Sequence, residues 1–153
     1  MNVEETMRMA IDLAKSSSLN TDDVPVGAVI LNSSGEVVAT GTNERKLHSD
    51  PSAHAEIVAI RKAATALGNW RLEGHTLVVT LEPCAMCAGA IVQSRIPKVI
   101  FGAWDEKAGA VGSVWDILRD PRTLNKVEVL SGVLASECAE LLGTFFQGKR
   151  KGN

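Results

Sequence analysis

The chain has 153 residues and a net charge of −2, and 45% of its residues are hydrophobic while 22% are charged. This length is sufficient for a buried core, the composition is that of a globular rather than a disordered protein, and the charge argues against a protein that coats nucleic acid through bulk positive charge. The N-terminus carries early acids, and no stretch reaches about 18 consecutive apolar residues, so the sequence predicts neither a leader peptide nor a membrane span.

The N-terminal half of the chain predicts a helix, a hairpin and a second helix. Apolar residues recur at helical spacing over residues 3–14, with charged residues on the other side. Two apolar runs around a Ser-Ser-Gly turn within residues 24–43 predict a β-hairpin. Asp50 as N-cap, with Pro51 at the first helical position, predicts the start of the next helix, which Gly68 is well placed to end.

The C-terminal half alternates strands and helices. Strands are predicted at residues 76–81, 98–103 and 126–130, a helix from Pro83 to about Ser94, a last helix at 135–146, and a loop at 104–125 with one helical turn near 113–118. This alternation predicts an α/β fold whose sheet is parallel in its later half. No Pro/Ser-rich linker divides the chain, so we expect a single domain over residues 1–153.

Cys84 and Cys87 stand three residues apart in the first turn of the helix that follows the strand at 76–81. Residues at this spacing share a helix face, and the helix dipole at that end favours thiolates. Taken alone, the pair is equally compatible with a metal site, a redox site or core packing. The chain has one other cysteine, Cys138, and shows no export signal, which indicates a reducing cytoplasm.

A histidine and a glutamate in "HAE" favour the metal. His54 and Glu56 lie near the start of the preceding helix, and we expect the strands before the two helices to lie side by side, so that the helix ends converge. An imidazole and two thiolates are a normal zinc set, and three protein ligands leave a position open for water, as in catalytic zinc sites. Glu56 could then move protons, while His48 and His75 lie in poor positions for a fourth ligand.

The segments "DPSAHAEIVAIRKAA", "NWRL", "TLVVTLEPCAMCAGAIVQSRI", "VIFGAWDEKAGAVGS" and "LLGTFF" resemble, in this order, the bacterial tRNA-specific adenosine deaminases (the TadA family) within the zinc-dependent cytidine and nucleobase deaminases. The resemblance implies a cytidine-deaminase-like three-layer fold with a mixed five-stranded sheet and helices on both faces. It implies a homodimer with one zinc ion per subunit, held by His54, Cys84 and Cys87. The implied reaction is hydrolytic deamination of adenosine to inosine at the wobble position of a tRNA anticodon, with a zinc-activated hydroxide and Glu56 as proton shuttle.

The resemblance also suggests substrate contacts. Asn43 resembles a residue that binds the target base, and Val26 resembles an apolar wall of the base pocket, although the first could be an ordinary loop asparagine and the second plain core. Asp105 and Lys107 resemble positions near the flanking sugars and phosphates, although charged loop residues are more often simply solvated. Trp104 is less typical of the family.

A basic tail begins at about residue 148. In the family the C-terminal helix lies near the anticodon stem, which fits a phosphate contact for "KRK" at 149–151, but Gly148 and Gly152 are expected to keep this tail mobile. Three other functions remain open. A deaminase of free bases or nucleosides (guanine, cytosine or cytidine) would use the same catalytic residues, a structural zinc module would lack catalysis, and a thiol–disulfide oxidoreductase would work without zinc.

Overall fold

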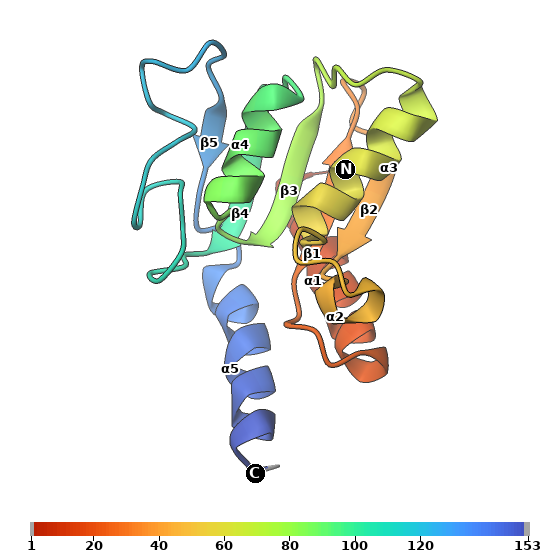
Figure 1. Ribbon diagram of the computed structural model, residues 1–153, viewed down its shortest axis with the longest axis vertical. Helices are drawn as coiled ribbons and strands as arrows, with labels where there is room; N and C mark the ends of the chain where they lie inside the picture. Colours follow the sequence, from red (N-terminus) through yellow and green to blue (C-terminus); the bar gives the residue numbers. More distant parts are fainter. Residues whose placement is uncertain (1, 152–153) are drawn as a thin grey trace.

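A computed structural model describes residues 2–151, and its centre is one five-stranded sheet with helices on both faces (Figure 1). The elements are α1 (Val3–Asn20), β1 (Gly27–Leu31), β2 (Val37–Thr42), α2 (Arg45–His48), α3 (Ala55–Leu67), β3 (Thr76–Leu81), α4 (Ala85–Gln93), β4 (Lys98–Ala103), β5 (Glu128–Leu130) and α5 (Ala135–Lys151). The predicted α/β class and mixed five-stranded sheet are confirmed. Among the described helices, none is both long and apolar enough to cross a membrane.

The direction of the strands brings several loops to one edge of the sheet. The strand order is β2-β1-β3-β4-β5; β1 is antiparallel to β2 and β3, while β4 is parallel to β3 and β5. Four strands therefore end at the same edge, which is where open α/β sheets bind their ligands. The expectation that the strands before α3 and α4 lie side by side was wrong, because β1 lies between β2 and β3.

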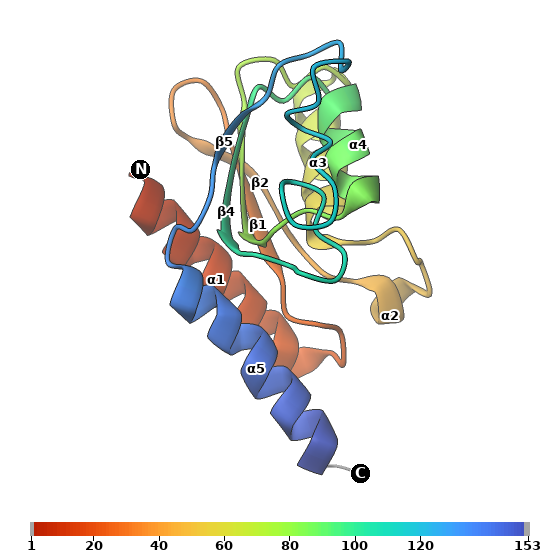
Figure 2. The same ribbon diagram turned by 90° about the vertical axis from the view of Figure 1, so that its left-hand side faces the viewer.

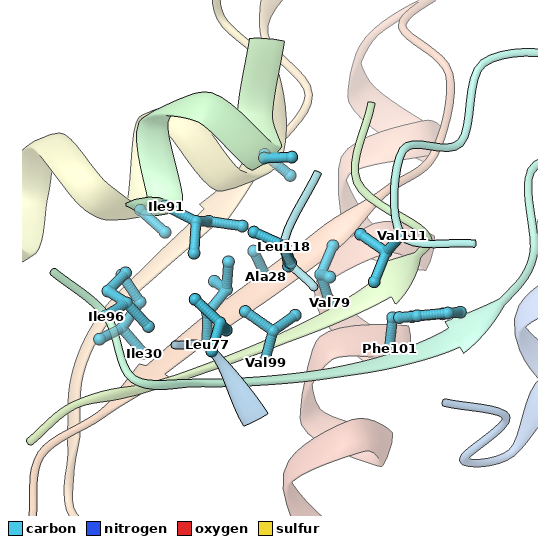
Figure 3. Close-up of a cluster of buried hydrophobic side chains, with 14 of the residues drawn as sticks. Ala28, Ile30, Leu77, Val79, Ile91, Ile96, Val99, Phe101, Val111 and Leu118 are labelled. Atoms are coloured by element: carbon cyan, nitrogen blue, oxygen red, sulfur yellow. The ribbon is translucent and has the colours of Figure 1, made fainter. Parts of the chain in front are cut away.

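Both faces of the central strands are buried, in two separate layers. Figure 2 shows α1 and α5 along one face of the sheet and α3 and α4 along the other. Leu77, Val79 and Phe101 point toward the α3–α4 side (Figure 3), whereas Val78 and Ile100 alternate with them and pack on the α1–α5 side. Burial on both faces explains why β3 and β4 are continuous apolar runs.

Two helices begin later than the sequence predicts. The first residue of α3 is Ala55, because the carboxylate of Asp50 accepts hydrogen bonds from the backbone N–H (2.9 Å) and hydroxyl (2.7 Å) of Ser52 and closes a turn instead of capping the helix. Likewise, Pro83 precedes α4, which begins at Ala85. The predicted end of α3 is confirmed, since Gly68 adopts φ 70° at its C-cap.

Three further differences concern the loops and the C-terminus. Helix α2 was not predicted, and residues 113–118 form no helical turn but instead fold back through a bridge between Val111 and Asp116. Helix α5 continues through Gly148 to Lys151, so the expected mobile tail is helical at these positions. The last residues of that predicted tail lie outside the described residues.

Candidate active site

Three side chains with metal-binding atoms meet beyond the edge where β2 and β3 end: His54, Cys84 and Cys87. The Nδ1 atom of His54 lies 3.5 Å from each sulfur, and all three ligand atoms lie within 4.8 Å of one another. An ion at usual zinc distances and tetrahedral angles would hold such a nitrogen and sulfur about 3.6 Å apart. The spacing therefore fits a tetrahedral zinc ion that keeps one position for a non-protein ligand.

The two helix starts bring these ligands together. His54 is the N-cap of α3 and Cys84 the N-cap of α4, and neither side chain makes a capping hydrogen bond. Both side chains thus remain free to bind a metal ion. Cys87 follows as the third residue of α4 and is fully buried. Because both helices point their N-termini at the cluster, their dipoles stabilise the negative charge of the thiolates.

The electrostatics of the cluster favour a cation. A hydrogen bond from Cys87, assisted by His54, lowers the pKa of Cys84 to about 3. The hydrogen bond with Cys84, together with burial, raises the pKa of Cys87, and contact with Cys84 also raises the pKa of His54. Two thiolates this close repel each other, so both are deprotonated only when a cation lies between them.

Glu56 lies beside the metal ligands as the second residue of α3, and it is only 4% exposed. Burial disfavours its charged form and raises the pKa of the carboxyl to about 6. Glu56, His54 and Cys84 line the same cavity. A carboxyl whose pKa lies near neutrality is suited to accept and release a proton there.

The cavity over the cluster has a volume of about 220 Å³. It is smaller than the roughly 300–1,000 Å³ of pockets for drug-sized ligands, so it suits one ring system. Of the predicted substrate contacts, Asn43, Val26 and Asp105 line it, whereas Lys107, between the lining residues Asp105 and Ala108, is exposed and does not line the cavity. The Oδ1 atom of Asn43 is buried without a hydrogen-bond partner among the described residues.

The other two histidines lie apart from the cluster, as the sequence predicts. The Nε2 atom of exposed His48 pairs with Glu44 at 3.1 Å, and the Nδ1 atom of His75 bonds the carbonyl oxygen of Glu73 at 2.9 Å. Neither belongs to the group of metal-binding atoms found in residues 2–151.

Sequence reasoning missed two charged residues that line the cavity, Arg45 and Glu82. Arg45 lies in α2, a four-residue helix with no periodic signal. Glu82 directly follows the buried strand β3 and is itself 2% exposed. A charged residue at the end of a doubly buried strand was the available signal, since such a charge needs partners in the fold.

Comparisons with known proteins agree with this geometry. Residues 1–103 match the family model of the cytidine and deoxycytidylate deaminase zinc-binding region. The chain is 48% identical to the tRNA-specific adenosine deaminase of Haemophilus influenzae over 97% of this chain and 85% of the relative, and 48% identical to that of Bacillus subtilis over 95% and 89%. A solved structure from work on A-to-I editing by tRNA:A34 deaminases superposes with a TM-score of 0.85, at 43% identity over 90% of this chain and 99% of that one.

Zinc-dependent deamination is the chemistry that the fold, the His-Cys-Cys cluster and the matching family model have in common, so the protein is a zinc-dependent deaminase. The agreement with the relatives covers nearly all of this chain and more than four fifths of each relative. The chain belongs to the family of tRNA-specific adenosine deaminases.

Proposed function

We propose that the protein deaminates adenosine to inosine, by hydrolysis, at the wobble position of a tRNA anticodon. The observation that carries this proposal is a base-sized cavity lined by Glu56, Asn43 and the metal-binding residues His54 and Cys84, in which the Oδ1 of Asn43 has no hydrogen-bond partner among the described residues. The 48% identity to tRNA-specific adenosine deaminases supports the substrate. We further propose that residues 1–153 form one deaminase domain, and that the reaction takes place in the cytoplasm, where reduced cysteines and tRNA are found.

The chemistry follows from the placement of the ligands and Glu56. His54, Cys84 and Cys87 would hold one zinc ion per subunit, and zinc bound there would lower the pKa of water from about 16 toward about 7. Glu56 would accept the proton that the water loses and deliver it to N1 of the adenine ring, which makes C6 more electrophilic, and the hydroxide that is left would add to C6. Glu56 would then carry the proton of the new C6 hydroxyl to the amino group. The C6–N bond breaks, ammonia leaves and inosine remains.

Two of the predicted contacts would orient the base. The carboxamide of Asn43 can accept and donate hydrogen bonds, as recognition of a purine edge requires. Its unpaired Oδ1 supports this role, and Val26 offers an apolar wall. We propose that Asp105 contacts the flanking sugar and that Lys107 contacts a phosphate.

The function is tested with purified, zinc-replete protein and a set of matched substrates. We expect inosine from an anticodon stem-loop RNA with A at the wobble position. We expect none from the same loop with that A moved, or from free adenosine, adenine, guanine, cytidine and cytosine. Activity on a free base without activity on RNA would instead support a metabolic deaminase with the same zinc chemistry.

The proton shuttle is tested by Glu56→Ala. Loss of a positioned general acid–base should lower the deamination rate by at least about 10²-fold, while zinc per subunit, measured by metal analysis, stays at the wild-type value. Parallel loss of zinc would assign Glu56 a structural role instead.

The zinc site is tested by thiol titration. All three cysteines are free of disulfides, and burial raises the pKa of the Cys138 thiol to about 11. We expect little reaction with a thiol reagent at pH 8 in the zinc-loaded protein, reaction of half-buried Cys84 after chelation, and reaction of the buried Cys87 and Cys138 only on unfolding. Rapid labelling of Cys84 in the zinc-loaded protein would argue against its coordination.

We also propose a homodimer. Exposed large apolar side chains support this, since Trp70, three residues after the end of α3, and Met86 on α4 are 56% and 41% exposed. Sedimentation equilibrium should then give about twice the 16.3 kDa of one chain. A mass of one chain at micromolar concentration would contradict the proposal.

A further inference from the structure

Glu82 binds a segment of the chain that is distant in sequence. Its Oε1 accepts hydrogen bonds from the backbone N–H of Asp105 (3.0 Å) and the hydroxyl of Ser113 (2.5 Å). Its Oε2 accepts from the backbone N–H groups of Val111 (2.9 Å) and Ser113 (3.1 Å). All four donors belong to residues 105–113, and Glu82 is almost completely buried beneath them.

This segment forms one wall of the cavity. Asp105 and Ala108 line the cavity together with His54 and Cys84. Apart from isolated bridges, residues 105–113 contain no helix or strand, so no regular hydrogen-bond ladder holds them. Hydrogen bonds to the carboxylate of Glu82 hold the segment instead. A further hydrogen bond, from the N–H of Ala110 to the carbonyl oxygen of Pro83 (2.8 Å), also holds it.

The fit between the carboxylate and the segment is close. A Cβ atom on Gly109 would collide with the carboxyl group of Glu82, so the backbone passes directly over it. Glu82 also differs from Glu56 in its hydrogen bonds, because both of its carboxylate oxygens accept hydrogen bonds from donors of the protein. It is therefore not available to bind the metal or to exchange a proton with substrate.

We propose that Glu82 is a positioning residue for the RNA: it fixes residues 105–113 as the wall along which the nucleotides flanking the target base bind. This inference rests on the proposed function. Neither the metal cluster nor the proton shuttle requires the buried carboxylate of Glu82.

The direction in which RNA affinity changes when the Glu82 carboxylate is removed distinguishes this role from simple electrostatic repulsion. Removing a carboxylate near a binding site for RNA reduces repulsion of phosphates, which by itself strengthens binding. Loss of the loop's anchor weakens binding, because the wall then has to be ordered when the RNA binds. Glu106, in the same segment, is exposed and makes no hydrogen bond among the described residues, so Glu106→Gln removes the same charge without removing an anchor.

The test measures binding of a fluorescein-labelled anticodon stem-loop RNA by anisotropy, in a Glu56→Ala background that prevents turnover. Glu82→Gln keeps the shape but loses an acceptor, and we expect the Kd to rise about tenfold, as for loss of one or two buried hydrogen bonds. Ser113→Ala removes one donor and leaves the carboxylate intact, with an expected rise of about threefold. Glu106→Gln should leave the Kd unchanged or lower it.

Two further measurements identify the mechanism. With Glu56 present, the single-turnover rate at saturating RNA should fall less than about threefold for Glu82→Gln, because the effect is on binding. Zinc per subunit should be unchanged. If Glu82→Gln loses zinc or fails to fold, Ser113→Ala decides, and an unchanged Kd in that variant would overturn the inference.

Editing of the stem-loop RNA by the wild-type protein distinguishes failure of the proposed function from failure of the role proposed for Glu82. A wild-type protein that leaves the stem-loop unmodified would overturn the proposed function and this inference together. A wild type that edits the RNA, with a Glu82→Gln variant that binds it as tightly as Glu106→Gln does, would overturn this inference alone.

Discussion

At the scale of single residues, two buried glutamates near the metal cluster have opposite surroundings. Burial raises the pKa of Glu56 to about 6. Burial also acts on Glu82, but hydrogen bonds from the Ser113 hydroxyl and from backbone N–H groups outweigh it and lower the pKa of that carboxyl. The first group can therefore hold a proton near neutral pH, while the second stays charged and structural.

Asn43 is expected to contribute to activity at some expense of stability. Its Oδ1 is buried and has no hydrogen-bond partner in the described part of the chain, and such an atom costs about 1–3 kcal/mol of desolvation. Asn43→Ala should therefore leave the free energy of unfolding unchanged or raise it by up to about 1 kcal/mol, measured in urea. Deamination of the stem-loop RNA should fall by about 10²-fold or more, because the base loses a specific polar contact.

Asn125 provides the matched control for this prediction. Its side-chain Nδ2 donates to the carbonyl oxygen of Val92 at 3.1 Å, so its polar group is satisfied within the fold. Asn125→Ala should lower stability by about 1 kcal/mol and leave activity unchanged. If Asn43→Ala destabilised the protein as much as Asn125→Ala does, the unpaired oxygen would not be reserved for substrate.

At the scale of elements, two glycines set how closely helices approach the sheet. A Cβ on Gly41, in β2, would meet the backbone of Ala55 and the N atom of Ala59 (2.8 Å) in α3. A Cβ on Gly27, in β1, would meet the backbone of Ala10 in α1 on the opposite face. Both helices thus lie on the sheet only because a side chain is missing beneath them.

These glycines allow a paired test. Gly41→Ala and Gly27→Ala should each cost about 1–3 kcal/mol of unfolding free energy, because both overpack a helix against the sheet. Only Gly41→Ala displaces the start of α3, which carries His54 and Glu56. We therefore expect reduced zinc content and deaminase activity in that variant alone, by metal analysis and RNA assay. Equal zinc loss in both variants would mean that the site responds to global destabilisation.

Local signals in the sequence predict much of this architecture. The strand periodicity, the Gly68 stop and the "HAE" and "PCAMC" segments predict the α/β order and the zinc ligands, because each of these signals depends on neighbouring residues. The insertion of β1 between β2 and β3 depends on pairing between distant segments, which a single sequence does not encode locally. The same holds for the bonds from residues 105–113 to Glu82.

Helix starts and ends were predicted less well. Asp50 followed by proline is a good local start signal, but the carboxylate of Asp50 closes a turn with Ser52, and α3 begins at Ala55 with His54 as its N-cap. At the C-terminus, Gly148 suggested mobility, yet α5 continues past it beside α1. Hydrogen bonds between near neighbours outweighed the start signal at Asp50, and the continuing helix outweighed the glycine at Gly148.

At the scale of the whole molecule, the charge distribution limits how the RNA is bound. The net charge is −2, and some cations near the site are already paired: the carboxylate of Asp22 binds Lys46 at 3.0 Å and also contacts Lys149. Lys107, on the cavity loop, forms no ion pair among residues 2–151 and is exposed. Binding should therefore depend on a few local phosphate contacts rather than on the overall field.

Lys107→Ala tests whether RNA binding depends on a local phosphate contact rather than on the net charge. If Lys107 contacts one phosphate of a single-stranded loop, its removal should reduce the slope of log Kd against log salt concentration by about 0.7 and weaken binding at low salt. The slope is measured by anisotropy of the labelled stem-loop over a salt series. Lys126→Ala, an equal change of net charge on an exposed residue just before β5 at the opposite edge of the sheet, should leave both slope and Kd unchanged. Equal effects of the two substitutions would show that net charge, and not a contact at the cavity loop, governs binding.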